Sequence, residues 1–216
     1  MSKIIVLIGA PGAGKGTQAR LLEERRGIPQ ISTGDIFREM KNDDTPLAKE
    51  LQKIMSSGKL ASDELTFQIV KNRTSREQDN YILDGFPRTA VQAEMLESLA
   101  TEQNRKIQAI EIDIPKEELF KRLTGRRSCP VCGEIYNIYS KPPKEENVCD
   151  IHPATQLAHR ADDNEESVLS RLEIYEEKTK PLIDYYEKTG RLEKVNGEGD
   201  LEVIYQSIDG LISREV

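Results

Sequence analysis

The chain has 216 residues, a net charge of −7 and 32% charged residues. This length is enough for one substantial hydrophobic core with small insertions, and it leaves no room for a second large domain. The negative balance argues against general binding to nucleic acid or to anionic membranes. No apolar run approaches the ~20 residues of a membrane span, and no basic leader precedes the first one, so we expect a cytoplasmic protein.

The first twenty residues carry the most specific pattern. Residues 4–8 are an apolar, mostly β-branched run typical of a strand buried on both faces, and residues 17–24 are good helix formers. Between them, residues 9–17 read GAPGAGKGT, the spacing of a phosphate loop. In such a loop, backbone N–H groups and a helix N-terminus surround an anion, and Lys15 reaches the β- and γ-phosphates. The predicted ligand is a nucleoside triphosphate; the alternative is an ordinary glycine-rich turn.

One position of this loop departs from the general pattern. Gly16 follows the lysine where a hydroxyl is usual, and the hydroxyl comes one residue later, at Thr17. We therefore expect a bound Mg²⁺ to depend less on a loop hydroxyl in this protein.

The remaining pattern alternates strands and helices. Strands are expected at residues 4–8, 27–32, 81–84, 107–114 and 192–196. Helices are expected at residues 17–24, 47–55, 64–70, 89–99, 115–125, 165–187 and 200–212, with a break near Pro181 and an N-cap at Ser62 or Asp63. This order predicts an α/β fold with a five-stranded parallel sheet flanked by helices and right-handed crossovers. The segment 32–61 is expected to be a small helical insertion, and 126–163 a set of short strands and turns.

Polar residues follow the third predicted strand. Asp84 ends this apolar strand, and Gly85, Phe86, Pro87 and Arg88 come next. Open α/β sheets bind ligands at the carboxyl ends of their strands, so Asp84 is a candidate partner for Mg²⁺ through water, or else a turn or capping aspartate.

The three cysteines have the spacing of a metal site. Cys129 and Cys132 are spaced C-x₂-C, and Cys149 and His152 are spaced C-x₂-H. Two tight turns of this kind complete a tetrahedron, and a Cys₃His set leaves no open position, so the sequence predicts a structural Zn²⁺. His159 is a less favoured fourth ligand.

Other interpretations of this stretch are weaker. Asp150 is a third candidate ligand, and the cysteines could also be incidental. A zinc-ribbon-like insertion can bind nucleic acid, but the acidic pairs at 145–146, 162–163 and 165–166 would repel a phosphate backbone. Stabilising a mobile flap is the better interpretation.

Arginines lie near segment ends and in the flap, at Arg38, Arg88, Arg126, Arg127, Arg160 and Arg171. Phosphoryl transfer depends on positioning and on neutralising charge, and the arginine fork suits phosphate oxygens. A surface charge is the default interpretation for each one, but Arg88 follows a strand end close to the expected phosphate site. Asp162 and Asp163 could either cap the next helix or brace the flap.

Together these motifs resemble the adenylate kinases, in particular the bacterial form with a long, metal-bearing lid. The resemblance covers essentially the whole chain and rests on residues 9–17, 32–35, 84–88, 125–127 and 160–166. It implies the reversible, Mg²⁺-dependent reaction of ATP with AMP to give two ADP, which maintains the adenine nucleotide balance. It also implies a monomer with a core domain (1–31, 62–124 and 164–216), a nucleoside-monophosphate-binding domain (32–61) and a lid (125–163).

The resemblance assigns roles residue by residue. ATP would be held by Gly12, Ala13, Gly14, Lys15, Gly16, Thr17, Arg126, Ile135, Tyr136 and Gly199. AMP would be held by Thr33, Arg38, Lys59, Leu60, Ala61, Gly85, Phe86, Pro87, Arg88, Gln92, Arg160 and Arg171. The catalytic set would be Lys15, Asp84, Arg88, Arg126, Arg160 and Arg171.

The sequence departs from the family in the lid. The fourth metal ligand of the family is usually cysteine or aspartate, whereas this chain offers His152, and the stretch before Arg160 is one residue longer than expected. Two other functions are compatible with these motifs. One is a kinase of another nucleoside monophosphate, against which Thr33 and Gln92 favour adenine. The other is a nucleotide-binding zinc module without catalytic activity.

Overall fold

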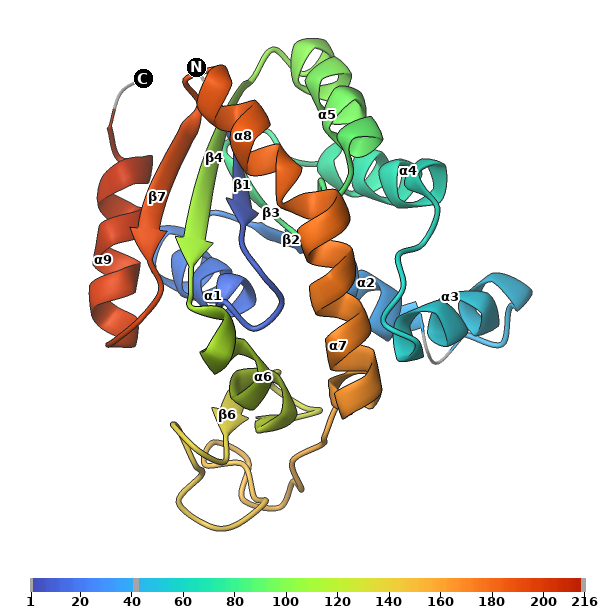
Figure 1. The fold of residues 1–216 in the computed structure, drawn as a ribbon, viewed down its shortest axis with the longest axis vertical. Coiled ribbons are helices and arrows are strands. Elements are labelled where there is room, and N and C mark those ends of the chain that lie inside the picture. Colours follow the sequence, from blue (N-terminus) through green and yellow to red (C-terminus); the bar gives the residue numbers. More distant parts are fainter. Residues whose placement is uncertain (1, 41–42, 215–216) are drawn as a thin grey trace.

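A parallel sheet forms the centre of the molecule. The structure is a computed structural model that describes residues 2–40 and 43–214. Its five-stranded sheet has the order β2-β3-β1-β4-β7, and all neighbouring strands are parallel (Figure 1). The strands are β1 (Lys3–Ile8), β2 (Gln30–Ser32), β3 (Tyr81–Asp84), β4 (Lys106–Asp113) and β7 (Leu192–Asn196). The predicted α/β architecture is confirmed.

Strand β1 lies in the middle of the sheet because both of its faces are apolar. All six of its residues are buried. Ile5 and Leu7 point into one core cluster, and Ile4, Val6 and Ile8 point into the other. A strand covered on both faces is what a continuous apolar run predicts.

Helices cover both faces of this sheet (Figure 1). One core cluster receives side chains from α1 (Lys15–Arg26), α6 (Lys116–Thr124), α7 (Glu165–Ile174) and α9 (Leu201–Ile212). The other receives them from α4 (Asp63–Thr74), α5 (Ala90–Glu102) and α8 (Pro181–Lys188). Within the described residues, no helix is both long enough and apolar enough to span a bilayer.

Several helices have a serine or threonine as their N-cap. Ser62 accepts a hydrogen bond from the backbone N–H of Leu65, so the N-cap expected at 62 or 63 is the serine. Thr89 caps α5 in the same way, through the N–H of Gln92. The helix expected at 165–187 is interrupted by a π-helical turn (Tyr175–Thr179) just before Pro181, because proline has no N–H to continue the ladder.

Two insertions leave the sheet at its carboxyl edge. The first contains α2 (Thr33–Glu39) and α3 (Pro46–Ser56), which lie to one side of the sheet (Figure 1). The second begins with the antiparallel pair β5 (Arg126–Ser128) and β6 (Ile135–Asn137) and continues as turns and isolated bridges. The expected helical and strand-and-turn character of these segments is confirmed; residues 41 and 42 of the predicted segment 32–61 lie outside the described residues.

Candidate active site

One large cavity opens at the carboxyl ends of the strands. Its volume is about 1980 Å³, and it reaches from the glycine loop after β1 to α2, α3 and the β5–β6 pair. All but one of the predicted nucleotide-site residues line it: Gly12, Ala13, Gly14, Lys15, Gly16, Thr17, Thr33, Arg38, Lys59, Leu60, Ala61, Asp84, Gly85, Pro87, Arg88, Gln92, Arg126, Ile135, Tyr136, Arg160, Arg171 and Gly199. The exception is Phe86, which is 1% exposed and stacks on Phe67 in the core.

The glycine loop points the N-terminus of α1 at this cavity. Gly14 immediately precedes α1 and has φ 98°, a left-handed conformation that glycine adopts without strain. Lys15 begins the helix, and its Nζ donates to the carbonyls of Gly9 at 2.7 Å and Ala10 at 2.9 Å. The loop therefore presents backbone N–H groups and a lysine together, which is an anion-binding arrangement.

Lys15 carries a lowered pKa. Burial disfavours its charged form and lowers the pKa to about 8, with nearby Arg88 and Arg171 acting in the same direction and Asp84 opposing them. The ammonium group of Lys15 therefore has too little negative charge around it in the unliganded protein. A bound anion would favour its charged form.

Asp84 lies close to the glycine that follows the lysine. A Cβ atom added at Gly16 would lie 3.1 Å from Oδ2 of Asp84, so any larger residue would push against this carboxylate. Gln30 also approaches Asp84, with its Nε2 donating to Oδ2 at 3.4 Å. Asp84 therefore lies directly against the loop; a helix cap, one of the alternatives for this residue, is excluded because Thr89 caps the following helix.

Cationic side chains converge on the cavity. Burial lowers the pKa of Arg88, Arg160 and Arg171, and the charges of neighbouring arginines lower each of them further. Arg38 contributes to this repulsion at both Arg88 and Arg160, while its own guanidinium pairs with Asp35. A cluster of like charges in a partly desolvated site is stabilised by a polyanionic ligand.

A buried carboxylate holds two of these arginines. Asp163 is fully buried and accepts from Nε and Nη2 of Arg126 at 2.7 and 2.5 Å. It also accepts from Nη1 of Arg171 at 3.0 Å. Burial alone would lower the pKa of Arg126, but these hydrogen bonds raise it. Asp162 and Asp163 could either cap the next helix or brace the flap, and the structure shows bracing. Capping is wrong, because Asn164 caps α7 by accepting from the N–H of Ser167.

Hydrogen bonds to the carbonyl of Gly85 fix the segment that follows β3. The carbonyl of Gly85 accepts from Thr33 Oγ1 at 3.0 Å and from Arg88 Nε at 2.9 Å. A Cβ atom at Gly85 would come within 2.8 Å of both side chains. A glycine is therefore required for Thr33 and Arg88 to approach one another at the edge of the cavity.

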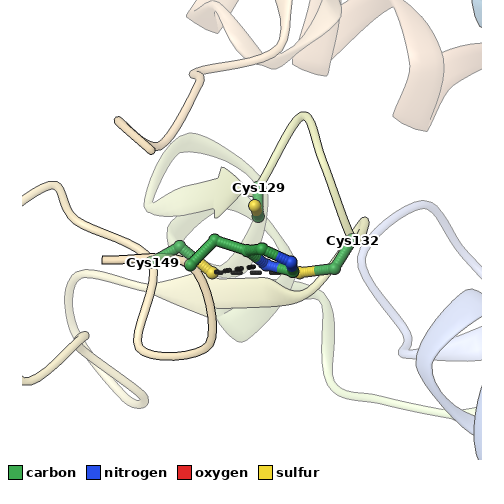
Figure 2. Close-up of side chains that lie close together, drawn as sticks. Cys129, Cys132 and Cys149 are labelled. Atoms are coloured by element: carbon green, nitrogen blue, oxygen red, sulfur yellow. Dashed lines mark hydrogen bonds between the residues drawn. The ribbon is translucent and has the colours of Figure 1, made fainter. Parts of the chain in front are cut away.

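The four predicted metal ligands form a cluster, of which Figure 2 labels the three cysteines. The ligand atoms of Cys129, Cys132, Cys149 and His152 all lie within 4.8 Å of one another. The Sγ atoms of Cys132 and Cys149 are 3.8 Å apart, and Cys149 Sγ lies 4.0 Å from Nδ1 of His152. Tetrahedral Zn–S bonds of ~2.3 Å imply ligand separations of about 3.8 Å, so the donor set fits Zn²⁺.

The surroundings of this cluster also suit a metal. Burial opposes ionisation of Cys149, but hydrogen bonds from the backbone of His152 and from the Tyr136 hydroxyl lower its pKa to about 6. A thiolate is the form that binds metals. The two rival ligands are elsewhere: Asp150 accepts from the backbone N–H of Lys144, and His159 lines the large cavity.

Several residues that line the cavity lie outside the predicted set, among them Gln30 and Arg122. Gln30 was missed because it lies in a strand and contacts Asp84 only through sheet pairing. Arg122 lines the cavity and donates to the carbonyl of Gly197 at 3.4 Å. It lies near the end of α6, just before the turn to β5, and no sequence pattern marked it as part of the site.

Comparison with known proteins agrees with this geometry. Residues 7–191 match the family model described as adenylate kinase. An adenylate kinase of Thermodesulfovibrio yellowstonii is 46% identical over 214 residues, covering 98% of this chain and 99% of that protein. One from Oceanobacillus iheyensis is 44% identical with the same coverage, and one from Thermotoga neapolitana is 47% identical over 91% of each chain. The chain therefore belongs to the adenylate kinase family of phosphotransferases.

Proposed function

We propose that this protein catalyses the reversible transfer of the terminal phosphoryl group of ATP to AMP, giving two ADP. The observation that carries the proposal is the size and lining of the cavity. Its volume of about 1980 Å³ exceeds the ~300–1000 Å³ typical of a site for one small ligand. A phosphate loop and a separate group of residues around Gly85 line the same space, so two nucleotides can meet there with their phosphates together.

On the ATP side, the glycine loop and Lys15 would hold the β- and γ-phosphates, with the N-terminus of α1 behind them. Ile135, Tyr136 and Gly199 line the same cavity and would contact the nucleoside, and Arg126 would contact the phosphates. Arg122 lines the same cavity and donates to the carbonyl of Gly197, so we assign it to this group.

On the AMP side, Thr33, the chain at Lys59–Ala61, the turn from Gly85 to Pro87 and Gln92 would surround the nucleoside. Arg38 and Arg88 would hold the phosphate of AMP, and Arg160 and Arg171 would contact the transferring group from the lid side. For Phe86 the contribution would come from its backbone, since its side chain is in the core.

The chemistry requires no side chain to act as a nucleophile or a strong base. The phosphate oxygen of AMP is already anionic and attacks the γ-phosphoryl group in line. The residues of the site therefore position the two nucleotides and neutralise the charge that spreads over the transferring oxygens. They also have to exclude water, which would otherwise accept the phosphoryl group. We assign the exclusion of water to the segment 125–163, acting as a lid. The segment 32–61 would be the monophosphate-binding domain, and the remainder would be the core.

Mg²⁺ is the expected partner of ATP, and the residues at the loop suit it. The Asp84 carboxylate and the Thr17 hydroxyl border the cavity beside Lys15 and provide oxygen ligands of the kind that Mg²⁺ binds directly or through water. When bound, the ion would supply positive charge that helps to neutralise the negative charge developing on the phosphate oxygens.

The Cys129–Cys132–Cys149–His152 cluster would hold a structural Zn²⁺ that ties the two turns of the lid. Protein purified without added zinc should contain about one zinc per chain, and chelation should lower its melting temperature, since ligation contributes directly to folding free energy. His152→Ala should weaken zinc binding by more than about 100-fold, because loss of even an outer-shell partner costs roughly 10–100-fold. His159→Ala is the matched control; if it lost zinc while His152→Ala kept it, the fourth ligand would be His159.

The lowered pKa of Lys15 predicts a pH dependence. A pKa of about 8 means that free enzyme loses the Lys15 charge as the pH rises past this value, and the charged form is the one that binds phosphate. The ratio kcat/KM for ATP, which reports ionisations of free enzyme, should be level below pH ~8 and fall above it. In Lys15→Arg, whose side chain stays charged, the fall should be absent. A profile in the unmodified protein that stays level to pH ~10 would contradict the assignment.

The proposed reaction is tested by a coupled assay with ATP-Mg²⁺ and a panel of monophosphates, AMP, GMP, CMP and UMP. AMP should give the highest kcat/KM. Better phosphorylation of any other monophosphate would identify a different substrate. No turnover with any of them would leave a binding protein without kinase activity.

A further inference from the structure

The side-chain amide of Gln92 is held at both of its polar atoms. Its Oε1 accepts from the backbone N–H of Arg88 at 2.8 Å, and its Nε2 donates to Oδ1 of Asp63 at 2.8 Å. Only 2% of Gln92 is exposed, so water competes little for these partners. The amide is therefore fixed before any ligand arrives.

These two partners also decide which end of the amide is which. A backbone N–H can only donate, and an ionised carboxylate can only accept. A reversed amide would place N–H against the N–H of Arg88 and oxygen against the carboxylate of Asp63. The direction of the Gln92 amide thus follows from the chemistry of its neighbours.

Asp63 is itself held in place. Thr89 Oγ1 donates to the same Oδ1 atom at 2.9 Å, and this hydroxyl in turn accepts from the backbone N–H of Gln92 at 3.1 Å. Asp63 is also the first residue of α4, where the partial positive charge of the helix N-terminus favours a carboxylate. Gln92 lines the nucleotide cavity, whereas Asp63 does not.

We propose that Asp63 is a positioning residue that, together with the backbone N–H of Arg88, sets the direction of the Gln92 amide, so that the site distinguishes a 6-aminopurine from a 6-oxopurine monophosphate. The proposal rests on the proposed function, in which Gln92 contacts the base of AMP. An amide has two hydrogens on nitrogen and two lone pairs on oxygen. With one of each already used, Gln92 still offers an acceptor beside a donor.

This pattern matches adenine. Adenine presents its 6-amino donor beside a ring-nitrogen acceptor, the pair to which a glutamine amide binds bidentately. A 6-oxo group in the same place would put an acceptor against the remaining lone pair of Oε1. A site whose buried polar group is left unpaired by the wrong substrate discriminates strongly against it.

The test compares AMP with inosine monophosphate, which differs at position 6 and in the proton on the adjacent ring nitrogen. Steady-state kinetics with ATP-Mg²⁺ would be measured for the unmodified protein and for Asp63→Ala, Asp63→Asn and Glu64→Ala. Asp63→Ala should raise KM for AMP by about ten-fold and lower the AMP-to-inosine-monophosphate ratio of kcat/KM by at least about ten-fold. Its kcat with AMP and its KM for ATP should stay within about two-fold, because Asp63 does not line the cavity.

The other variants separate positioning from a general effect on folding. The carboxamide oxygen of Asp63→Asn can accept both hydrogen bonds, so this variant should keep the discrimination of the unmodified protein. Glu64→Ala removes a carboxylate from the same helical turn, at an exposed position, and should change nothing. If Asp63→Ala does not fold, Asp63→Leu keeps the volume without an acceptor and carries the same expectation.

The outcomes also separate this inference from the proposed function. An unmodified protein that does not phosphorylate AMP would overturn the proposed function. An active unmodified protein whose AMP preference survives Asp63→Ala would overturn only the role of Asp63. Equal loss of discrimination in Asp63→Asn and Asp63→Ala would also overturn it, because the acceptor would then not be what matters.

Discussion

Replacing Lys15 by methionine should lower kcat by at least about 100-fold, the loss typical of removing one charge-stabilising donor from a transition state. Lys15 begins α1, lines the cavity and is anchored to the carbonyls of Gly9 and Ala10, so its ammonium group lies over the glycine loop. Methionine has a similar length and can occupy the same buried space, but it can neither donate nor carry charge. Steady-state kinetics with saturating ATP-Mg²⁺ and AMP measure the effect.

A matched control separates this loss from damage to the fold. Lys188→Met makes the same change at an exposed position near the end of α8 and should leave kcat unchanged. The melting temperature of Lys15→Met should not fall, because burial of this charged group is unfavourable in the unliganded protein. Turnover of Lys15→Met within a few-fold of the unmodified protein would show that the glycine loop does not hold the transferring phosphate.

Asp163→Ala should lower the free energy of unfolding by about 2–3 kcal/mol. Removing one partner of a buried ion pair typically costs ~3–5 kcal/mol, and the lower value applies because the Arg126 and Arg171 side chains keep 15% and 17% exposure. Without Asp163, Arg126 would lose the carboxylate it is paired with, and Arg171 would keep only Asp162. Denaturant unfolding of the unliganded protein measures the loss.

Nucleotide should reduce this difference. Phosphate groups bound in the cavity would supply negative charge to the same arginines, and ligand binding stabilises only the folded state. The difference in melting temperature between Asp163→Ala and the unmodified protein should therefore shrink when both are saturated with nucleotide. Asp184→Ala, at an exposed position of α8, should change stability by less than about 0.5 kcal/mol. A loss for Asp163→Ala no larger than that of Asp184→Ala would show that the arginines do not need this counterion.

Local patterns were enough to predict most of the fold. The apolar run of β1 reads as a buried strand because burial on both faces removes any need for polar residues, and Thr89 caps α5 within three residues of its own position. The glycine loop is likewise a continuous stretch, so its spacing alone predicts its chemistry. Paired ligand spacing in the two cysteine turns predicted the cluster in the same way, and the four ligand atoms do converge.

The features that sequence alone left open depend on contacts between distant segments. Whether Asp163 caps a helix or braces arginines could not be decided locally, because its partner Arg126 is on another strand-and-turn segment and Asn164 supplies the cap. Gln30 meets Asp84 only because β2 pairs with β3. The anchoring of Gln92 by Asp63 joins the starts of two helices, α4 and α5, and has no sequence pattern of its own.

By itself, the sequence determined the order of strands and helices, and it predicted the phosphate-binding loop and the four Cys and His side chains that cluster. These depend on periodicity and short spacing, which act over one or two turns of chain. Only the tertiary structure decided which carboxylate neutralises which arginine, how closely Gly16 lies against Asp84, and how the Gln92 amide is directed. Each of these requires burial and a partner from another element, because a side chain becomes fixed only where folding removes water and brings a complementary group within hydrogen-bond distance.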